Sequence, residues 1–423
     1  MSNPFYYQGP VTLNQFFNRK AEIRRIVGRI NNYGQSSAIS GEPLMGKTSL
    51  LRHISSPEIY KQFYNENTHF FFSFIDCQIL PNPFTQDRFW KKAISPLKER
   101  LFDKDPDSEV ANSYKVCEEN SFEVFVLERL LSQMEKNNLR LVLLLDEFDK
   151  LIQLIESNLN AFLGGLRSLA SRGRSLSLVI ASRKTLVQLS KETSRINYGS
   201  PYFNFINDIQ FGCFSDEDSN LLLDTGKDRF KERDCKFIKK IAGGYPFLLQ
   251  VAASELWDLY DDQKIDDVSR LKLLWRRIYE KVHIVFSDMW NSWTHHMRLA
   301  MFIVFLAQAT KQITMNLHIQ SLMKVLYELK YEINYLKGKG FISEDLRNQS
   351  GWCIRSEALV YWLTIELRQN FYDKTVADRY IQFHGWNDFI SDKQKNELIN
   401  FVQSTVNNFD EILWQLINQW ITE

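Results

Sequence analysis

Short apolar runs in the first half of the chain predict the strands of a parallel sheet. Residues 141–145 are five consecutive apolar residues, a pattern typical of a strand buried on both faces. Segments 36–40, 69–75 and 176–181 have a similar strand-like composition. Helical stretches alternate with these runs. This alternation predicts an α/β domain built on a doubly wound parallel sheet.

The pattern changes in the second half, where residues 294–367 predict a winged helix. Residues 319–336 read as one helix, because their apolar positions recur every three or four residues and form one buried stripe. Gly338 and Gly340 end that helix. The predicted order of elements is helix 297–307, helix 319–336, strand 340–343, strand 352–355 and helix 357–367.

Composition narrows the class of protein without identifying it. The 52 basic residues nearly balance the 51 acidic ones, so any binding of nucleic acid or membrane must come from a local patch. The first residues lack a secretory signal pattern, and the longest apolar run, 299–307, is shorter than a membrane span. The five cysteines are scattered and form no zinc motif. We therefore expect a cytoplasmic protein.

Residues 41–48 match the phosphate-binding pattern G-x-x-x-x-G-K-[ST] in full. Glycines at 41 and 46 allow backbone N–H groups to approach phosphate oxygens, and a helix predicted from Ser49 adds the positive end of its dipole. Lys47 is expected to reach the outer phosphates, and the Thr48 hydroxyl to bind Mg²⁺. The residues expected to contact ATP or ADP are Gly41, Glu42, Pro43, Leu44, Met45, Gly46, Lys47, Thr48 and Ser49.

Two carboxylates follow the apolar run 141–145, where ligands bind in open α/β sheets. Asp146 is expected to support Mg²⁺, and Glu147 to orient and deprotonate the attacking water. Arg183 follows another predicted strand, so it either contacts the outer phosphate or is a solvated strand end. With Lys47, these three residues form the predicted catalytic set.

One segment before the phosphate-binding loop resembles a known family. Residues 16–23 (FFNRKAEI) are similar to the motif that precedes this loop in STAND-type ATPases, the signal-transduction branch of the AAA+ class. In that family the segment lies beside the adenine and ribose, which implies a nucleotide contact for Arg19. The family commonly has glycine where this chain has Asn18.

Two later segments extend the resemblance. Residues 211–218 are similar to the link into the family's small helical domain, and residues 241–248 contain its G-x-P motif. The resemblance implies that Pro246 packs on the base, although a simple break between two helices also explains this sequence. The expected domains are a P-loop ATPase domain at 1–213, a helical lid at 214–290, a winged helix at 291–370 and a helical C-terminal segment at 371–423.

The resemblance implies a slowly hydrolysing ATPase that acts as a switch. ADP would hold the domains together, and ATP would favour an open, oligomeric form. Many relatives serve antiviral defence or programmed-death signalling. This chain has no evident effector domain, so the expected partners are other copies and a separate effector or sensor protein.

Two alternatives remain open. A DNA-acting AAA+ regulator would use the winged helix on duplex, but the modest basic face is more typical of a solvated surface. That face comprises Lys324, Lys330, Lys337, Lys339 and Arg347. A scaffold that binds ATP without turnover is the other alternative.

The C-terminal segment is rich in aromatic residues, which predict either core packing or a docking surface for a partner or subunit. These are Phe383, Trp386, Phe389, Phe401, Phe409, Trp414 and Trp420.

Overall fold

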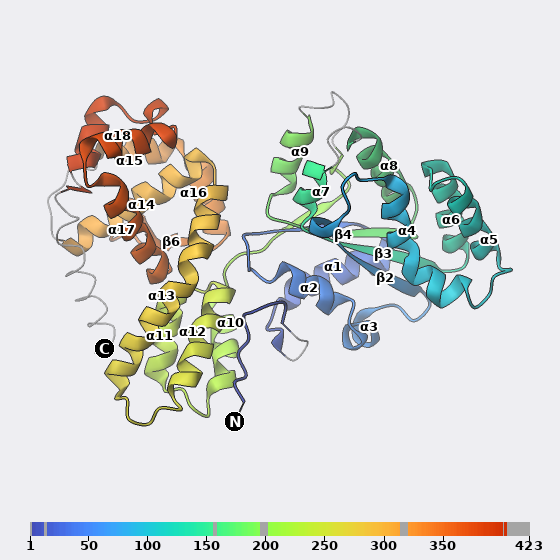
Figure 1. The fold of residues 1–423 in the computed structure, drawn as a ribbon, viewed down its shortest axis with the longest axis horizontal. Helices are drawn as coiled ribbons and strands as arrows, with labels where there is room; N and C mark the ends of the chain where they lie inside the picture. Colours follow the sequence, from blue (N-terminus) through green and yellow to red (C-terminus); the bar gives the residue numbers. More distant parts are fainter. Residues whose placement is uncertain are drawn as a thin grey trace. The chain divides into compact units, whose positions relative to one another are not determined.

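The computed structural model describes residues 2–11, 15–154, 159–194, 202–313, 320–400 and 402–403. Its contacts divide the chain into two compact units, and each is described by itself (Figure 1). The N-terminal unit comprises Pro10–Glu42 and Gly46–Phe211. The C-terminal unit comprises Met1–Gly9, Pro43–Met45 and Gly212–Glu423. The four-domain division expected from the sequence stays a prediction.

The N-terminal unit is built on a five-stranded sheet with the order β2-β3-β4-β1-β5, in which every pair is parallel. Four of the strands lie where the apolar runs predicted them. The fifth, β5, was not predicted, because three of its four residues are polar. The strands are β1 (Ser37–Ser40), β2 (His69–Asp76), β3 (Leu139–Asp146), β4 (Leu176–Ser182) and β5 (Asn207–Gln210).

Helices cover both faces of this sheet. The chain moves from β1 out to β2 and then back through β3 and β4, so right-handed crossovers place the connecting helices on opposite faces. The predicted doubly wound α/β sheet is therefore present. The helices are α1 (Lys20–Tyr33), α2 (Lys47–Ile54), α3 (Pro57–Phe63), α4 (Gln86–Leu97), α5 (Glu109–Glu119), α6 (Val124–Lys136), α7 (Phe148–Leu154), α8 (Leu159–Arg172) and α9 (Leu186–Ser194).

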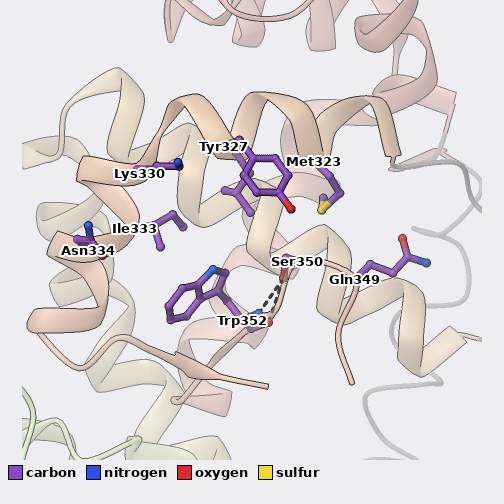
Figure 2. Close-up of a pocket in the computed structure, with 9 residues that line it drawn as sticks. Met323, Tyr327, Lys330, Ile333, Asn334, Gln349, Ser350 and Trp352 are labelled. Carbon is purple, nitrogen blue, oxygen red and sulfur yellow. Dashed lines mark hydrogen bonds between the residues drawn. The ribbon is translucent and has the colours of Figure 1, made fainter. Parts of the chain in front are cut away.

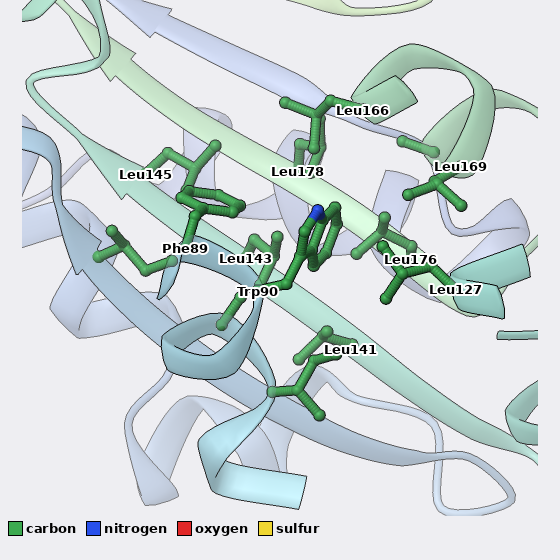
Figure 3. Packing of buried hydrophobic residues seen from close by; sticks show 14 of the residues in the cluster. Phe89, Trp90, Leu127, Leu141, Leu143, Leu145, Leu166, Leu169, Leu176 and Leu178 are labelled. Carbon is green, nitrogen blue, oxygen red and sulfur yellow. The ribbon is translucent and has the colours of Figure 1, made fainter. Parts of the chain in front are cut away.

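One face of the sheet carries the largest part of the core. Trp90 of α4 lies among leucines of β3 and β4, including Leu143 and Leu178, and α6 and α8 close the layer (Figure 3). Every residue of β3 and β4 is buried. This packing fixes the positions of the strand ends that carry Asp146 and Ser182.

The C-terminal unit is mostly helical. The helices α10, α11 and α13 pack against α12, and α17 joins this group to α14. The helices are α10 (Asp216–Leu223), α11 (Glu232–Ala242), α12 (Pro246–Leu259), α13 (Asp267–Ser292), α14 (His295–Ile313), α15 (Gln320–Glu328), α16 (Lys330–Gly338), α17 (Glu357–Phe371) and α18 (Lys374–Phe383).

Residues 294–367 contain a two-stranded antiparallel sheet, β6 (Ile342–Glu344) and β7 (Trp352–Ile354), between α16 and α17. The helix predicted at 319–336 is wrong in one respect, because the chain breaks at Leu329 into α15 and α16. Leu326, Leu329 and Ile333 are all buried, so the apolar stripe continues through the break. Periodicity alone therefore does not reveal it.

The described part of the C-terminal segment packs against α14. Trp386 is fully buried, its indole N–H donates to the His295 carbonyl, and its ring lies 4.9 Å from that of Phe302. Phe389 contacts the His296 ring, whereas Phe383 is exposed. Phe401, Phe409, Trp414 and Trp420 lie outside the described residues. Core packing thus accounts for Trp386, while Phe389 is half-buried.

Among the described residues, no helix is long and apolar enough to cross a membrane.

Candidate nucleotide site

The phosphate-binding loop connects β1 to α2, with its second glycine in a left-handed conformation. Gly46 has φ 89° and directly precedes α2, and a Cβ there would meet no atom within 4 Å. Leu44 is also left-handed, at φ 58°. Gly46 is thus required by its backbone conformation alone, since the space beside it would admit a Cβ.

The N–H of Gly41 has a partner within the sheet, and its predicted nucleotide contact stays a prediction. It donates a hydrogen bond of 3.1 Å to the Ser182 carbonyl and so extends the sheet. A Cβ at this position would lie 2.9 Å from Phe211 Cβ and 3.1 Å from the Phe211 carbonyl oxygen. Gly41 is therefore required by the close approach of the chain at Phe211.

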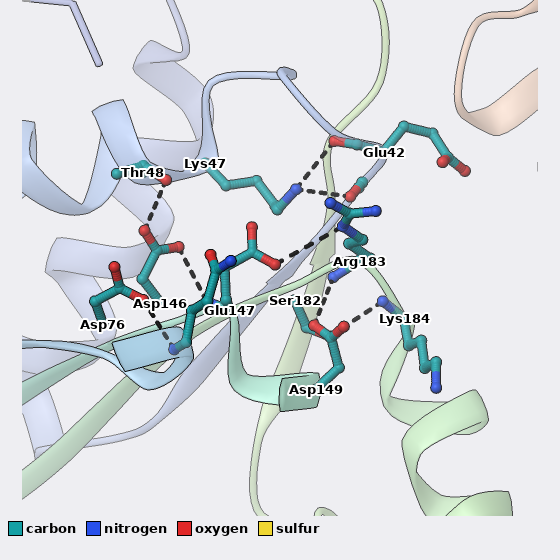
Figure 4. A network of polar contacts seen from close by, with 12 residues as sticks. Glu42, Lys47, Thr48, Asp76, Asp146, Glu147, Asp149, Ser182, Arg183 and Lys184 are labelled. Atoms are coloured by element: carbon teal, nitrogen blue, oxygen red, sulfur yellow. Dashed lines mark hydrogen bonds and ion pairs between the residues drawn. The ribbon is translucent and has the colours of Figure 1, made fainter. Parts of the chain in front are cut away.

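Lys47 is folded back onto the loop. Its ammonium donates hydrogen bonds to the carbonyl oxygens of Gly41 (2.8 Å) and Glu42 (3.0 Å), and the side chain is buried (Figure 4). Burial lowers the pKa of Lys47, and the carboxylates of Glu147, Glu42 and Asp146 oppose that shift. The charge is therefore held by loop carbonyls and nearby acids, in a place from which it can turn to a phosphate.

Thr48 and Asp146 are brought together from α2 and β3. The Thr48 hydroxyl donates a 2.7 Å hydrogen bond to Asp146 Oδ2. Burial raises the pKa of Asp146, while the bond from Thr48 and the charge of Lys47 lower it. A hydroxyl and a carboxylate at this spacing are hard oxygen donors of the kind that Mg²⁺ prefers, so the predicted metal residues fit that ion.

Glu147 has a left-handed backbone, with φ 49°. Its N–H donates to Asp146 Oδ1 at 3.2 Å, and its carboxylate lies 3.8 Å from the Arg183 guanidinium at the end of β4. Burial raises the pKa of Glu147. The four residues of the predicted catalytic set thus gather at the carboxyl ends of β3 and β4 and the loop after β1 (Figure 4).

A further residue, Asp149, was missed by the sequence analysis. Its carboxylate is buried and accepts hydrogen bonds from the Ser182 hydroxyl (3.0 Å) and from the Arg183 N–H (3.2 Å). It therefore fixes the main chain that carries the Arg183 side chain. The available signal was a third acid in the sequence DEFD, on the first turn of α7.

Arg19 directly precedes α1, where it has φ 60°. Its guanidinium lies 3.4 Å from the Glu22 carboxylate and 4.3 Å from the centre of the Phe211 ring. Because Phe211 also contacts Gly41, this segment lies beside the start of the loop. Asn18 has φ 56°, which explains why asparagine can stand where relatives of the resembled type have glycine.

The remaining predicted contact residues are divided between the units. Ser49 is buried on α2, and its hydroxyl accepts a hydrogen bond from the Val11 N–H. The loop tip Pro43–Met45 groups with the C-terminal unit, where the Tyr245 hydroxyl donates to the Pro43 carbonyl. Pro246 is the buried first residue of α12. Its predicted contact with the base stays a prediction.

Comparison of the sequence with known families gives a match over residues 6–326 to the AAA-like domain. The match spans more than half of the chain. The chain belongs to the AAA-like domain family. No curated protein sequence matches it.

The AAA-like chain also resembles solved structures. A Walker-type ATPase of Pyrococcus abyssi shares 16% identity and a TM-score of 0.53, over 85% of this chain and 99% of that one. This similarity, with the parallel sheet, shows the P-loop α/β fold. The ORC2 protein of Aeropyrum pernix matches at 12% identity and TM-score 0.46, over 81% and 91% of the two chains. A STAND protein of Pyrococcus horikoshii with a tetratricopeptide repeat sensor matches at 14% identity and a TM-score of 0.35. The match covers 96% of this chain and 54% of that one.

The basic residues of the proposed DNA face differ in exposure within the C-terminal unit. Lys339 is fully buried, the Lys337 ammonium lies 2.6 Å from Glu344, and the Arg347 guanidinium lies 2.9 Å from Asp345. Lys324 and Lys330 are exposed and the Arg347 side chain is 82% exposed, so burial withholds only Lys339 from a phosphate.

The same region contains a cavity of about 260 Å³. Its walls include the aromatic rings of Tyr327 and Trp352, with Lys330 and Asn334 beside them (Figure 2).

Proposed function

We propose that this AAA-like protein is an ATP-binding and slowly hydrolysing switch of the STAND type, whose nucleotide state controls assembly and signalling to a separate effector. The observation that carries the proposal is the Thr48–Asp146 contact of 2.7 Å, with Glu147 directly beside it. A phosphate-binding loop, two metal-binding oxygens and a general base are the parts that phosphoryl transfer to water requires.

ATP binding requires a rearrangement of Lys47. Its two hydrogen bonds to the Gly41 and Glu42 carbonyls must be exchanged for phosphate oxygens, while the N–H groups around Gly46 and the start of α2 meet the phosphates. Thr48 and Asp146 would hold Mg²⁺, which neutralises phosphate charge when bound. The loop residues 41–49, with Arg19 and Pro246, form the proposed nucleotide contacts.

Glu147 is proposed as the general base. Its turned backbone holds the carboxylate at the end of β3, directly after Asp146, where it can orient a water beside the phosphates. Arg183 contacts this carboxylate. An outer phosphate competes with Glu147 for the Arg183 guanidinium, so its arrival would free the carboxylate to accept a proton from water.

The C-terminal unit supplies the proposed helical lid and the proposed winged helix. Helices α10–α13 correspond to the lid, and α14–α17 with β6 and β7 follow the order of a winged helix. The basic residues of that region are few and Lys339 among them is buried, which favours a role inside the protein over duplex binding. The DNA-acting regulator therefore remains the second candidate.

The test is the solution mass of the Glu147→Gln variant, measured by light scattering with ADP and with ATP·Mg²⁺. We expect a discrete oligomer with ATP alone, and nucleotide binding with hydrolysis reduced by at least about 100-fold. Lys47→Ala is the matched control, which should lose binding and assembly together. Equal mass in both nucleotides contradicts the switch, and normal hydrolysis by Glu147→Gln removes Glu147 from the base role. Tight ATP retention without phosphate release from the unaltered protein would indicate the scaffold instead.

A further inference from the structure

Residues 2–9, which we call the N-terminal strap, lie on α12 within the C-terminal unit. Phe5 is the apolar anchor of this segment and is only 5% exposed. Its ring stacks on Phe230 at 5.4 Å and meets the edge of Trp257 at 6.2 Å. An aromatic side chain enclosed by two others is a typical anchor of peptide recognition.

Asn3 supplies a second, polar anchor. Its side-chain NH2 group carries two protons and has three acceptors within reach, which are the Ser254 carbonyl (3.1 Å), the Ser254 hydroxyl (3.0 Å) and the Asp258 carboxylate (2.9 Å). The Oδ1 atom of the same side chain accepts a hydrogen bond from the Phe5 N–H, which fixes the turn between Asn3 and Phe5. An aspartate here could not donate these bonds, so the position selects an amide.

The rest of the strap continues along the same helix. The Tyr6 N–H donates to Gln250 Oε1 at 3.2 Å, and the Tyr7 hydroxyl donates to Glu255 Oε1 at 3.2 Å. The Lys281 ammonium from α13 lies 3.4 Å from Glu255 and 5.4 Å from the centre of the Tyr7 ring. Backbone and side chains of the strap are therefore both bound.

The helix face beneath the strap is polar although it is buried. Gln250, Ser254 and Glu255 are 7%, 7% and 9% exposed, respectively. A helix face built only for core packing would carry apolar residues at these positions, since buried polar groups are costly without partners. The face is suited to a peptide with an asparagine, a phenylalanine two residues later, and tyrosines.

The strap has only a short connection to the nucleotide site. The chain passes into the N-terminal unit at Pro10, and the Val11 N–H donates to the Ser49 hydroxyl, two residues after Lys47. Four residue steps separate Tyr7 from Val11, so their Cα atoms can never be more than about 14 Å apart. A separation of Tyr7 and Val11 beyond this reach must break one of the two anchors.

We propose that the surface of α12 is a reversible peptide-binding site whose ligand is the strap, and that nucleotide-driven opening releases the strap through this short connection. The coupling rests on the proposed function, whereas the peptide site stands on its own contacts.

The peptide site is tested with the chain lacking residues 2–9 and a fluorescent synthetic peptide of Ser2–Gly9, by anisotropy. We expect saturable binding that Asn3→Ala or Phe5→Ala in the peptide weakens at least tenfold. A Gln8→Ala peptide is the matched control and should bind normally, since Gln8 is exposed. No binding to a shortened chain that folds and binds ATP would overturn the site, as would equal binding of all the peptides.

The coupling is tested by hydrogen exchange of the Tyr6 amide in the full-length Glu147→Gln variant. We expect ATP·Mg²⁺ to speed this exchange at least about fivefold relative to ADP, the lower end of typical coupling. Six Gly-Ser residues inserted between Gly9 and Pro10 should abolish the difference and leave the strap bound.

Unchanged exchange in a protein whose mass does respond to ATP would overturn the coupling alone. A mass that ignores nucleotide contradicts the proposed switch instead, while the peptide measurement still decides the binding site. The insertion variant also tests the coupling when the shortened chain does not fold. A nucleotide effect that persists in the insertion variant refutes the short connection as its cause.

Discussion

Replacing Gly41 by alanine separates two reasons for a glycine at the start of a phosphate-binding loop. If the glycine served only to let phosphate approach, the nucleotide-free protein would tolerate a methyl group there. The structure predicts otherwise, because the new Cβ would lie 2.9 Å from Phe211 Cβ and 3.1 Å from the Phe211 carbonyl oxygen. The backbone fixes the positions of both neighbouring atoms, so a rotamer change of Phe211 relieves neither contact.

The magnitude follows from the cost of overpacking. Forcing an extra methyl group into a packed site costs about 1–3 kcal/mol, and the contact with backbone places Gly41→Ala in the upper half of that range. Gly28, in the middle of α1, is the matched control, since a Cβ there meets nothing within 4 Å. Alanine at that helical position should stabilise the protein by about 0.5–1 kcal/mol.

The assay is urea unfolding of the nucleotide-free protein, followed by circular dichroism, for both variants. We expect the midpoint to fall for Gly41→Ala and to rise for Gly28→Ala. Equal stability of Gly41→Ala and the unaltered protein, with only ATP binding reduced, would refute the packing argument. It would return Gly41 to the phosphate-approach role that the sequence suggested.

Two further predictions concern the C-terminal unit. Burial raises the pKa of Glu357 to about 7, with Lys240 partly opposing the shift. The folded state then holds a proton that the unfolded chain releases above about pH 4.5, so stability should fall as pH rises between these values. Glu357→Gln should therefore be more stable than the unaltered protein above pH 7 and equal to it near pH 4, as measured by thermal melts. A stability difference that stays constant across this range contradicts the raised pKa of Glu357. We also expect no steep salt dependence of duplex DNA binding, because the basic residues of this face are few and Lys339 among them is buried; a slope corresponding to several phosphate contacts would favour the DNA-acting regulator.

The sequence predicted most of the sheet and the central residues of the site. A run such as 141–145 is apolar because its strand is buried on both faces, and a motif such as 41–48 fixes residue types at fixed spacing. The carboxyl ends of parallel strands share one edge of a sheet. This rule was enough to expect Lys47, Asp146 and Glu147 near one another.

What the sequence missed depends on contacts between distant segments. The need for glycine at 41 comes from Phe211, and the role of Asp149 comes from the end of β4. β5 escaped notice because an edge strand with polar residues lacks the buried pattern of a central one. The break at Leu329 leaves the apolar stripe intact, so no periodicity marks it.

The left-handed backbone at Glu147 has a consequence for attempts to improve the protein. A side chain in this conformation costs about 1–2 kcal/mol, a cost that glycine avoids. A laboratory selection for heat resistance alone would thus favour glycine at 147 and discard the carboxylate on which turnover is proposed to depend. Thermal stability and catalytic activity thus favour different residues at position 147. A mutant library intended to keep both must hold this position constant.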